Sequence, residues 1–282
     1  MVKAHAYFKI IRPANAFMTA ATVFLGWWLS KSALPLHQLI LLMYAAVASL
    51  SYGNVINDIA DLDTDRINKP GRPLPSGMIS VKQAATYSFI LASTALAAGF
   101  TVSPLFGLAT AVPVFLLSLY AWKLKATPLI GNLLVSLLVA YALIYGGLTS
   151  DQFSLLWGPA SLAFLINMCR EIIKDLQDIK GDKTSGIHTT ALLSPRMINL
   201  MIVVISVLYL FAIWIPFFSG FGPIYLALVF VTTIPLHAWW LRLFFSDKRE
   251  RNFGTISASI KVELLAGLFS LSIDRLLLPF IL

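Results

Sequence analysis

The sequence predicts an all-α, polytopic membrane protein, and three observations support this fold class. Hydrophobic residues make up 58% of the 282 residues and only 12% are charged, about half the charged share of a typical soluble domain. The mean hydropathy is +0.81. Apolar stretches of about 20 residues, the length of a helix that crosses a bilayer, recur along the whole chain. Soluble, disordered and fibrous classes are therefore disfavoured.

Nine such stretches follow one another, and we expect each to form a transmembrane helix of a single membrane domain that covers residues 1–282. They are 14–30, 36–56, 81–101, 104–121, 129–149, 153–174, 195–216, 221–245 and 257–280. Six prolines stand at or near the starts, where a missing N–H costs little: Pro13, Pro35, Pro104, Pro128, Pro195 and Pro223. The first stretch lacks a small-residue cleavage site, so we expect a retained helix rather than a signal peptide.

Basic residues predict the orientation of these helices. If the N-terminus is cytoplasmic, the inner segments and adjoining helix ends hold all of the 21 lysines and arginines except Lys31 and Arg275. Cytoplasmic loops of membrane proteins carry such an excess. We therefore expect a multi-pass protein of the cell membrane whose N-terminus and active-site loops are cytoplasmic and whose C-terminus lies outside. The net charge of +8 reflects these loops and predicts no nucleic-acid partner.

Acidic residues are the candidate metal ligands, because the single cysteine and the four scattered histidines have no ligand spacing. Eight of the 13 acidic residues stand in two runs, at the inner ends of the second and sixth stretches: Asp58, Asp61, Asp63 and Asp65, and Glu171, Asp175, Asp178 and Asp182. Residues three or four apart share a helix face, so each run forms an acidic stripe. Mg²⁺ binds such oxygen clusters together with substrate phosphates. Ordinary solvated helix ends are the alternative, which two matched stripes in an acid-poor chain disfavour.

Basic residues accompany both stripes. They are Arg66, Lys69 and Arg72 after the first stripe, Lys174, Lys180 and Lys183 at the second, and Lys123 and Lys125, with Tyr120, at the end of the fourth stretch. Loop cations alone are topology signals. Beside paired acidic stripes they are suited to bind an anion that also binds the metals, so the combination predicts a diphosphate site.

These residues resemble the motifs of the UbiA superfamily of intramembrane prenyltransferases. Its first motif, N-D-x-x-D-x-x-x-D, matches Asn57 to Asp65, and its second, D-x-x-D-x-x-x-D, matches Asp175 to Asp182. Two further segments match as well: Arg12, Pro13 and Asn15, and the stretch 69–73. The resemblance covers the whole chain and implies a nine-helix bundle with a central cavity that opens to the cytoplasmic side.

The resemblance also implies two Mg²⁺ ions, an isoprenyl diphosphate donor and a set of site residues. The implied metal ligands are Asn57, Asp58, Asp61, Asp65, Asp175, Asp178 and Asp182. The implied catalytic residues are Asp61, Asp65, Asp178, Asp182 and Tyr120. The implied substrate-binding residues are Asn15, Asn54, Arg66, Lys69, Arg72, Lys123, Lys125, Arg170 and Lys174. Asp58 and Asp175 either ligate through water or orient their neighbours.

One segment departs from the family pattern. Family members often carry Tyr-x-x-x-Lys after the fourth helix, whereas here Tyr120 is followed by lysines three and five residues on, Lys123 and Lys125. Either lysine is a candidate for contact with the diphosphate, and Tyr120 is alternatively an aromatic residue of the membrane interface.

The second motif and the stretch 120–132 resemble most closely the branch of the family that makes an ether lipid. That branch transfers a geranylgeranyl group from geranylgeranyl diphosphate to the hydroxyl of geranylgeranylglyceryl phosphate. The phosphate of this acceptor requires further cations, either Lys3, His5, Lys9 and Arg12, or Arg170 and Lys174. An aromatic acceptor, such as a hydroxybenzoate or naphthoate, is the alternative.

Two other classes are disfavoured. A transporter or ion channel would place charges near mid-membrane, whereas here they cluster on the inner side. A CDP-alcohol phosphotransferase would require D-G-x-x-A-R, which is missing after Asp65. Membrane lipid is an expected partner, and the sequence gives no sign of a required protein partner.

Overall fold

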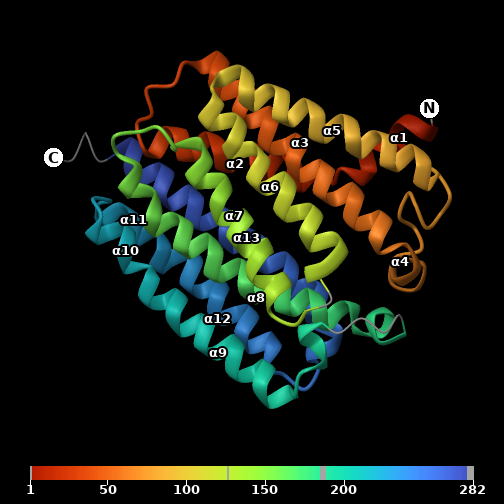
Figure 1. Cartoon of the computed structure of the whole chain (residues 1–282). Helices are drawn as coiled ribbons and strands as arrows, with labels where there is room; N and C mark the ends of the chain where they lie inside the picture. The colour runs from red at the N-terminus through yellow and green to blue at the C-terminus, as the bar shows by residue number, and fades with distance from the viewer. Residues whose placement is uncertain (1, 126, 185–188, 278–282) are drawn as a thin grey trace. The chain divides into compact units, whose positions relative to one another are not determined.

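The computed structural model describes residues 2–125, 127–184 and 189–277, all of them in helices or in the turns between helices. The side chains of residues 2, 3 and 180–184 lie outside this description. Four residues that the sequence analysis named as acids or cations near the site are among them: Lys3, Lys180, Asp182 and Lys183. The helices are α1 Val2–Ile10, α2 Pro13–Leu29, α3 Leu36–Ala60, α4 Leu62–Asn68, α5 Val81–Val102, α6 Pro104–Leu119, η1 Tyr120–Leu124, α7 Ile130–Gly146, η2 Phe153–Leu156, α8 Trp157–Thr184, η3 Thr190–Leu192, α9 Pro195–Ala212, α10 Trp214–Phe218, α11 Pro223–Leu228, η4 Val229–Thr233, α12 Ile234–Phe244 and α13 Arg249–Leu277 (Figure 1).

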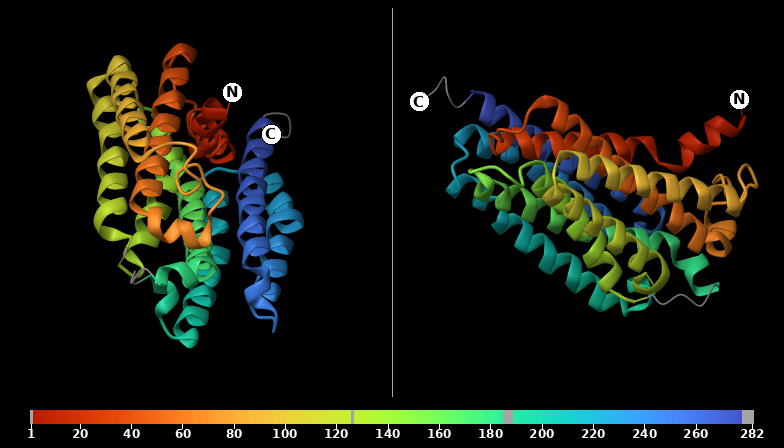
Figure 2. Two further views of the ribbon diagram at one scale, coloured as in Figure 1. Left: turned by 90° about the vertical axis from the view of Figure 1, so that its right-hand side faces the viewer. Right: turned by 45° about the horizontal axis from the view of Figure 1, so that its top comes forward.

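These helices fall into two compact units. The first unit comprises residues 1–24, 34–134 and 180–189, and the second comprises residues 25–33, 135–179 and 190–282. In the first unit, α3, α5 and α6 lie side by side, as both views of Figure 2 also show. A small apolar cluster in this unit joins α1 to α3 and to the loop before α5, through Ile10, Val55, Leu74 and Ile79. That cluster fixes the N-terminal helix against the segment that carries the first acidic run.

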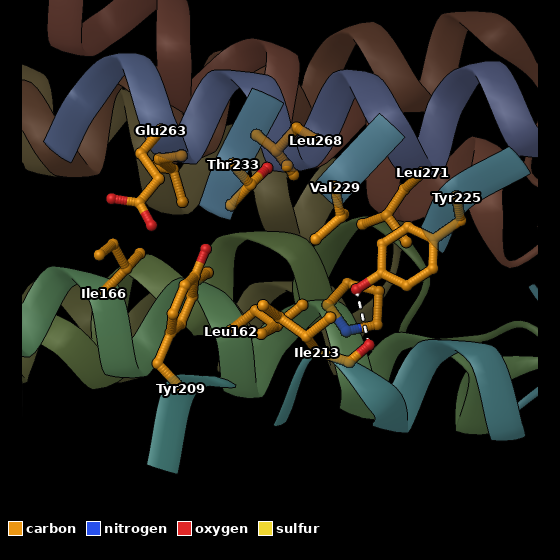
Figure 3. A pocket seen from close by; sticks show the side chains of 14 residues that line it. Leu162, Ile166, Tyr209, Ile213, Tyr225, Val229, Thr233, Glu263, Leu268 and Leu271 are labelled. Carbon is orange, nitrogen blue, oxygen red and sulfur yellow. Dashed lines mark hydrogen bonds between the residues drawn. The ribbon is translucent and has the colours of Figure 1, made fainter. Parts of the chain in front are cut away.

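The second unit contains the larger apolar core, built from α8 to α13. Within it, α13 packs along α11, η4 and α12. The core borders a partly open cavity lined by residues of α8, α9, α11, η4 and α13. Glu263 and Tyr209 lie at one end of the cavity, and Tyr225 and Leu271 lie at the other (Figure 3).

Glu263 is a fully buried acid in the middle of α13, and it is hydrogen-bonded. Its Oε1 lies 2.8 Å from His237 Nδ1, and Trp240 Nε1 donates to Oε2 at 2.6 Å. Both partners belong to α12, so the carboxylate links two neighbouring helices. Buried polar groups of a membrane protein are stable only with such partners.

Helix starts follow the prolines and serines of the sequence. Pro13, Pro104, Pro195 and Pro223 are the first residues of α2, α6, α9 and α11, as expected for a residue that lacks an N–H. Ser80 caps α5 in a capping box with Gln83, in which each side chain bonds the backbone of the other. These local signals explain why the observed starts agree with the predicted ones.

A helix, or a run of consecutive helices, covers most of each predicted apolar stretch. Within the described residues, six helices or runs of helices are long and apolar enough to cross a membrane, and α7 is a shorter apolar helix of 17 residues. The chain is thus an all-helical, multi-pass membrane protein.

Candidate diphosphate and metal site

The first acidic run lies where α3 ends and α4 begins. Asp61 stands at the junction, and helical turns continue through it, since Asp61 N donates to Asn57 O at 2.9 Å and Asp65 N donates to Asp61 O at 2.8 Å. Asn57, Asp61 and Asp65 therefore lie one turn apart along one face, as the spacing predicts. Both aspartates are buried.

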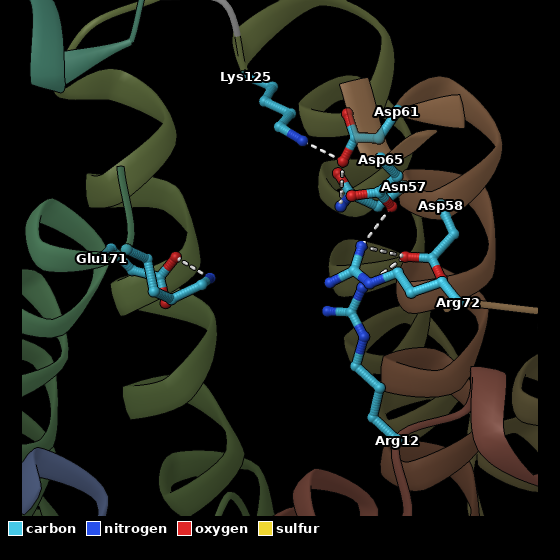
Figure 4. Close-up of polar contacts among 9 residues, drawn as sticks. Arg12, Asn57, Asp58, Asp61, Asp65, Arg72, Lys125 and Glu171 are labelled. Carbon is cyan, nitrogen blue, oxygen red and sulfur yellow. Dashed lines mark hydrogen bonds and ion pairs between the residues drawn. The ribbon is translucent and has the colours of Figure 1, made fainter. Parts of the chain in front are cut away.

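Each carboxylate of this run has a basic partner (Figure 4). Lys125 Nζ contacts Asp61 Oδ2, and Arg72 Nη1 lies 2.5 Å from Asp65 Oδ2. These contacts join the end of α3, the loop 69–80 and the segment after η1, which are distant in sequence. Two predicted cations, Lys125 and Arg72, thus neutralise the like charges of Asp61 and Asp65.

Asp58 is bound by two arginines. It is almost fully buried, and its Oδ1 lies 2.5 Å from Arg12 Nη2 and 3.1 Å from Arg72 Nη1. The two guanidinium groups lie next to one another (Figure 4). Removing one partner of a buried ion pair leaves an uncompensated charge, so Asp58 and the two arginines form one interdependent cluster.

The turn that carries Arg12 is held in place from two sides. Buried Asn54 donates through Nδ2 to Ile11 O at 3.1 Å, and Lys9 Nζ donates to Gly71 O at 2.8 Å. Arg12 itself has a φ of 56°, a left-handed conformation that is unfavourable for a residue with a Cβ and that is often found at functional sites. The surrounding contacts therefore maintain a strained backbone that directs the Arg12 side chain to Asp58.

A π-helical turn, η1, determines which lysine reaches the acidic run. Lys125 N donates to Tyr120 O at 3.0 Å, an i to i+5 bond. A π turn holds about one residue more than an α turn, so Lys125 takes the position that the fourth residue after Tyr120 would take in an α-helix. Lys123 is exposed, whereas Lys125 contacts Asp61.

Burial raises the pKa of Asp65 above its usual range. The adjacent Arg72 acts in the opposite direction, and the neighbouring Asp58 and Asp61 raise the pKa further. Loss of solvent penalises the charged carboxylate. A divalent cation beside Asp65 would therefore stabilise its charged form more than the single guanidinium of Arg72 does.

The donor set fits a hard divalent cation. Oδ1 of Asn57 is buried and has no hydrogen-bond partner within the described residues, while Nδ2 donates to Asp61 Oδ2 at 2.9 Å. This amide oxygen and the carboxylates of Asp61 and Asp65 are ligands that Mg²⁺ prefers. In the part of the chain that the structure describes, no three acidic, histidine or cysteine side chains already form a metal cluster. Lys125 and Arg72 pair with the carboxylates of Asp61 and Asp65.

The second acidic run lies on α8 in the second unit. Glu171 is buried and pairs with Arg170 Nη1 at 2.8 Å and with Lys174 Nζ at 2.7 Å. Arg170 Nε is buried and has no partner among the described residues. Asp175 and Asp178 are half-buried on the same helix, and Asp182 is on its last turns with its side chain outside the description.

The remaining predicted residues are more scattered. Arg66 is 60% exposed and pairs with Asp63 at 2.7 Å. Asn15 and Lys69 are half-buried and have polar or electrostatic partners, and Tyr120 is half-buried in η1. The sequence named Arg12 only as one of several candidate cations for the acceptor phosphate and Glu171 only as a member of the second acidic run, and it placed neither at the diphosphate and metal site. The signal for Arg12 was its place before Pro13, and the signal for Glu171 was its place in the second acidic run.

Comparisons with known proteins agree over almost the whole chain. A sequence model of the UbiA prenyltransferase family matches residues 18–259. The chain is 33% identical over 261 residues to the digeranylgeranylglyceryl phosphate synthase of Thermococcus kodakarensis, covering 92% of this chain and 94% of that protein. A structure of digeranylgeranylglyceryl phosphate synthase superposes with a TM-score of 0.78 at 26% identity, covering 98% of this chain and 99% of that one. A UbiA homolog from Archaeoglobus fulgidus, bound to GPP and Mg²⁺, shares the fold with a TM-score of 0.66 at 18% identity, covering 95% and 99%.

Proposed function

The chain belongs to the UbiA prenyltransferase family, and we propose that it transfers a geranylgeranyl group from geranylgeranyl diphosphate to the free hydroxyl of geranylgeranylglyceryl phosphate. The products are digeranylgeranylglyceryl phosphate and diphosphate. The relative from Thermococcus kodakarensis carries the name of this synthase and aligns over 92% of the chain. The observation that carries the proposal is the alignment of Asn57 with the buried Asp61 and Asp65, whose carboxylates already have cationic partners.

Asn57, Asp61 and Asp65 of the first run, and Asp175, Asp178 and Asp182 of the second, are the residues that would hold two Mg²⁺ ions, and Asp58 would act through water or by orienting its neighbours. When bound, Mg²⁺ neutralises charge on the diphosphate and so favours cleavage of the C–O bond of the donor. The unpartnered Asn57 Oδ1 and the raised pKa of Asp65 support the assignment of the first run. Asp58 contributes from the second sphere, because two arginines take up its carboxylate.

Lys125 and Arg72 are the residues of the first unit best placed to bind the diphosphate. Each neutralises a carboxylate of the run, and each would be available to a phosphate oxygen if that carboxylate held Mg²⁺ instead. Their charge then stabilises the leaving diphosphate. Arg66, Lys69, Lys123, Arg170, Lys174, Asn15 and Asn54 complete the proposed binding residues, and Tyr120 lies beside Lys125 through the π turn.

The allylic cation left on the donor requires a site without water. Apolar helix walls would exclude water, so that the acceptor rather than a water molecule attacks the cation. The acceptor hydroxyl oxygen forms the new C–O bond, and its proton passes to the released diphosphate, which balances the reaction.

The membrane arrangement completes the proposal. The nine apolar stretches cross the bilayer, the N-terminus is cytoplasmic and the C-terminus is outside, because this arrangement places all but two of the lysines and arginines on the inner side. Both acidic runs then lie at the cytoplasmic face, where the central cavity opens.

The test is a product analysis with two sets of acceptors. Purified protein in detergent is incubated with Mg²⁺ and geranylgeranyl diphosphate, with geranylgeranylglyceryl phosphate in one tube and a panel of aromatic acids and quinone precursors in another. Mass spectrometry is expected to find the diprenylated glyceryl phosphate, dependent on Mg²⁺ and absent in EDTA. A prenylated aromatic product without the ether lipid would contradict the proposed acceptor and leave the chain a prenyltransferase of another branch.

A further inference from the structure

The Arg12–Asp58–Arg72 cluster has features of an anion site distinct from the carboxylates that would hold the metals. Arg12 contacts Asp58 and neither Asp61 nor Asp65. Asp58 takes up one of the five N–H donors of Arg12, and within the described residues Arg12 has no second hydrogen-bond acceptor on a side chain. The cluster is built by contacts among three segments, the turn at residues 10–12, α3 and the loop 69–80.

We propose that Arg12 binds the phosphate monoester of the lipid acceptor and that Asp58 is the residue that positions it. This inference rests on the proposed function, in which Asp65 serves a metal. Arg12 and Arg72 both contact Asp58, so two guanidinium groups lie against one carboxylate and the cluster keeps a net positive charge. The planar fork of a guanidinium matches a phosphate group in geometry as well as in charge.

The strained backbone of Arg12 is a second, independent observation for this site. A φ of 56° is unfavourable for arginine, yet Lys9 and Asn54 hold the turn on both sides. An arginine whose only role was to keep its helix end on the cytoplasmic side would not need these contacts to the backbone of its turn. The contacts fix the direction of one side chain toward Asp58, which is what a positioned phosphate ligand requires.

The surroundings of Arg12 suit a lipid rather than a soluble anion. The α1 helix buries Ala6 and Ile10 and exposes His5, Phe8 and Lys9. Phe17 on α2 is 74% exposed. Exposed aromatic residues before and after Arg12, together with basic ones, are typical of a helix at the membrane interface, which is the depth of a lipid phosphate.

The test measures acceptor binding rather than turnover. The full-length protein in detergent, without donor and with EDTA, is titrated calorimetrically with geranylgeranylglyceryl phosphate and with geranylgeranylglycerol, the same lipid without its phosphate. Wild-type protein is expected to bind the phosphate lipid at least roughly tenfold more tightly, the effect of one charged hydrogen bond. Arg12→Ala is expected to remove most of this preference, and Arg12→Lys to restore part of it. Arg196→Ala, which removes an exposed arginine on α9, is the matched control that keeps it.

Three results decide the outcome. If Arg12→Ala keeps the full preference, or lowers the affinity for geranylgeranyl diphosphate instead, the inference is wrong. If Arg170→Ala rather than Arg12→Ala removes the preference, the acceptor phosphate binds in the second unit and the inference is wrong. If the wild-type protein makes no ether lipid, but the Arg12→Ala variant loses the preference for the phosphate lipid, the phosphate site is supported and only the proposed function is wrong. Asp58→Asn, expected to weaken the preference without removing the arginine, serves if Arg12→Ala does not fold.

Discussion

Lys125 and Lys123 differ in position by only two residues, yet only Lys125 contacts the acidic run. We predict that Lys125→Ala lowers kcat by about 10²–10³-fold, the cost of removing one group that stabilises developing charge. Lys123→Ala is expected to lower it much less. Steady-state rates of diphosphate release compare the two variants, and equal losses would contradict the role assigned to the π turn.

Asp65 gives a prediction about pH. Its raised pKa means that the folded protein holds a proton on this carboxyl at a higher pH than usual, and a protonated carboxyl cannot ligate Mg²⁺. The Mg²⁺ concentration that half-saturates donor binding is therefore expected to rise as the pH is lowered from neutrality toward the raised pKa of Asp65. Circular dichroism at each pH checks that the protein stays folded. A midpoint that does not change with pH would contradict the assignment of Asp65 as a metal ligand.

Single residues were predictable where local spacing determines them. The alignment of Asn57, Asp61 and Asp65 follows from helical periodicity, and the structure has it. The pairing of Asp58 with Arg12 was not predictable, because it joins residues 46 positions apart. Such a contact depends on how α1, α3 and the loop 69–80 pack, which no pattern in the sequence encodes.

Among the helices, Gly26 marks a close approach between α2 and α7. A Cβ at this position would lie 1.9 Å from Leu143 O, a backbone atom that cannot turn away, whereas a Cβ at Gly267 of α13 would meet nothing within 4 Å. We predict that Gly26→Ala destabilises the protein by about 1–3 kcal/mol through overpacking. Gly267→Ala, the matched control, is expected to be neutral or to stabilise by up to about 1 kcal/mol, because alanine favours helix.

Thermal unfolding in detergent measures both glycine variants. The prediction would be wrong if Gly26→Ala unfolded at the same temperature as wild-type protein, or if Gly267→Ala caused the larger loss.

Asp274 supports the start of α11 from the far end of α13. It is fully buried, and it accepts hydrogen bonds from Gly222 N at 2.7 Å and from Tyr225 N at 2.9 Å. Asp274→Ala leaves both N–H groups without this acceptor, and we expect a loss of about 2–5 kcal/mol from two unsatisfied buried donors. Asp274→Asn keeps one acceptor and is expected to cost less. Denaturant titration ranks the two variants, and a reversed order would contradict the capping role.

Helix starts were more predictable than helix interiors. Prolines and serines act locally, so the starts of α6 and α9 follow directly from Ser103-Pro104 and Ser194-Pro195. The π turns η1 and η4 were not predicted. A π turn adds one residue to a helix that otherwise reads as continuous, and tertiary contacts rather than a sequence signal decide where it lies.

For the whole molecule, composition and hydropathy were enough to predict an all-helical membrane protein, since too few charged residues remain to cover a soluble surface. The division into two compact units was not predicted, because the apolar stretches are alike along the chain. The grouping of Asn57, Asp61 and Asp65 on one face was predictable from their spacing, but the contacts of Lys125 and Arg72 with two of these carboxylates were not.

The most direct measurement is the equilibrium binding of geranylgeranyl diphosphate to the purified protein as a function of Mg²⁺. Wild-type protein is expected to bind the donor more tightly as Mg²⁺ is added and to lose this binding in EDTA. Asp61→Asn is expected to raise the required Mg²⁺ at least roughly tenfold, the effect of one lost charged ligand. Asp63→Asn, an exposed neighbour whose side chain is 87% accessible, is expected to behave as wild type. Donor binding that is equally tight in EDTA, or unchanged by Asp61→Asn, would contradict a metal–diphosphate site at the first acidic run.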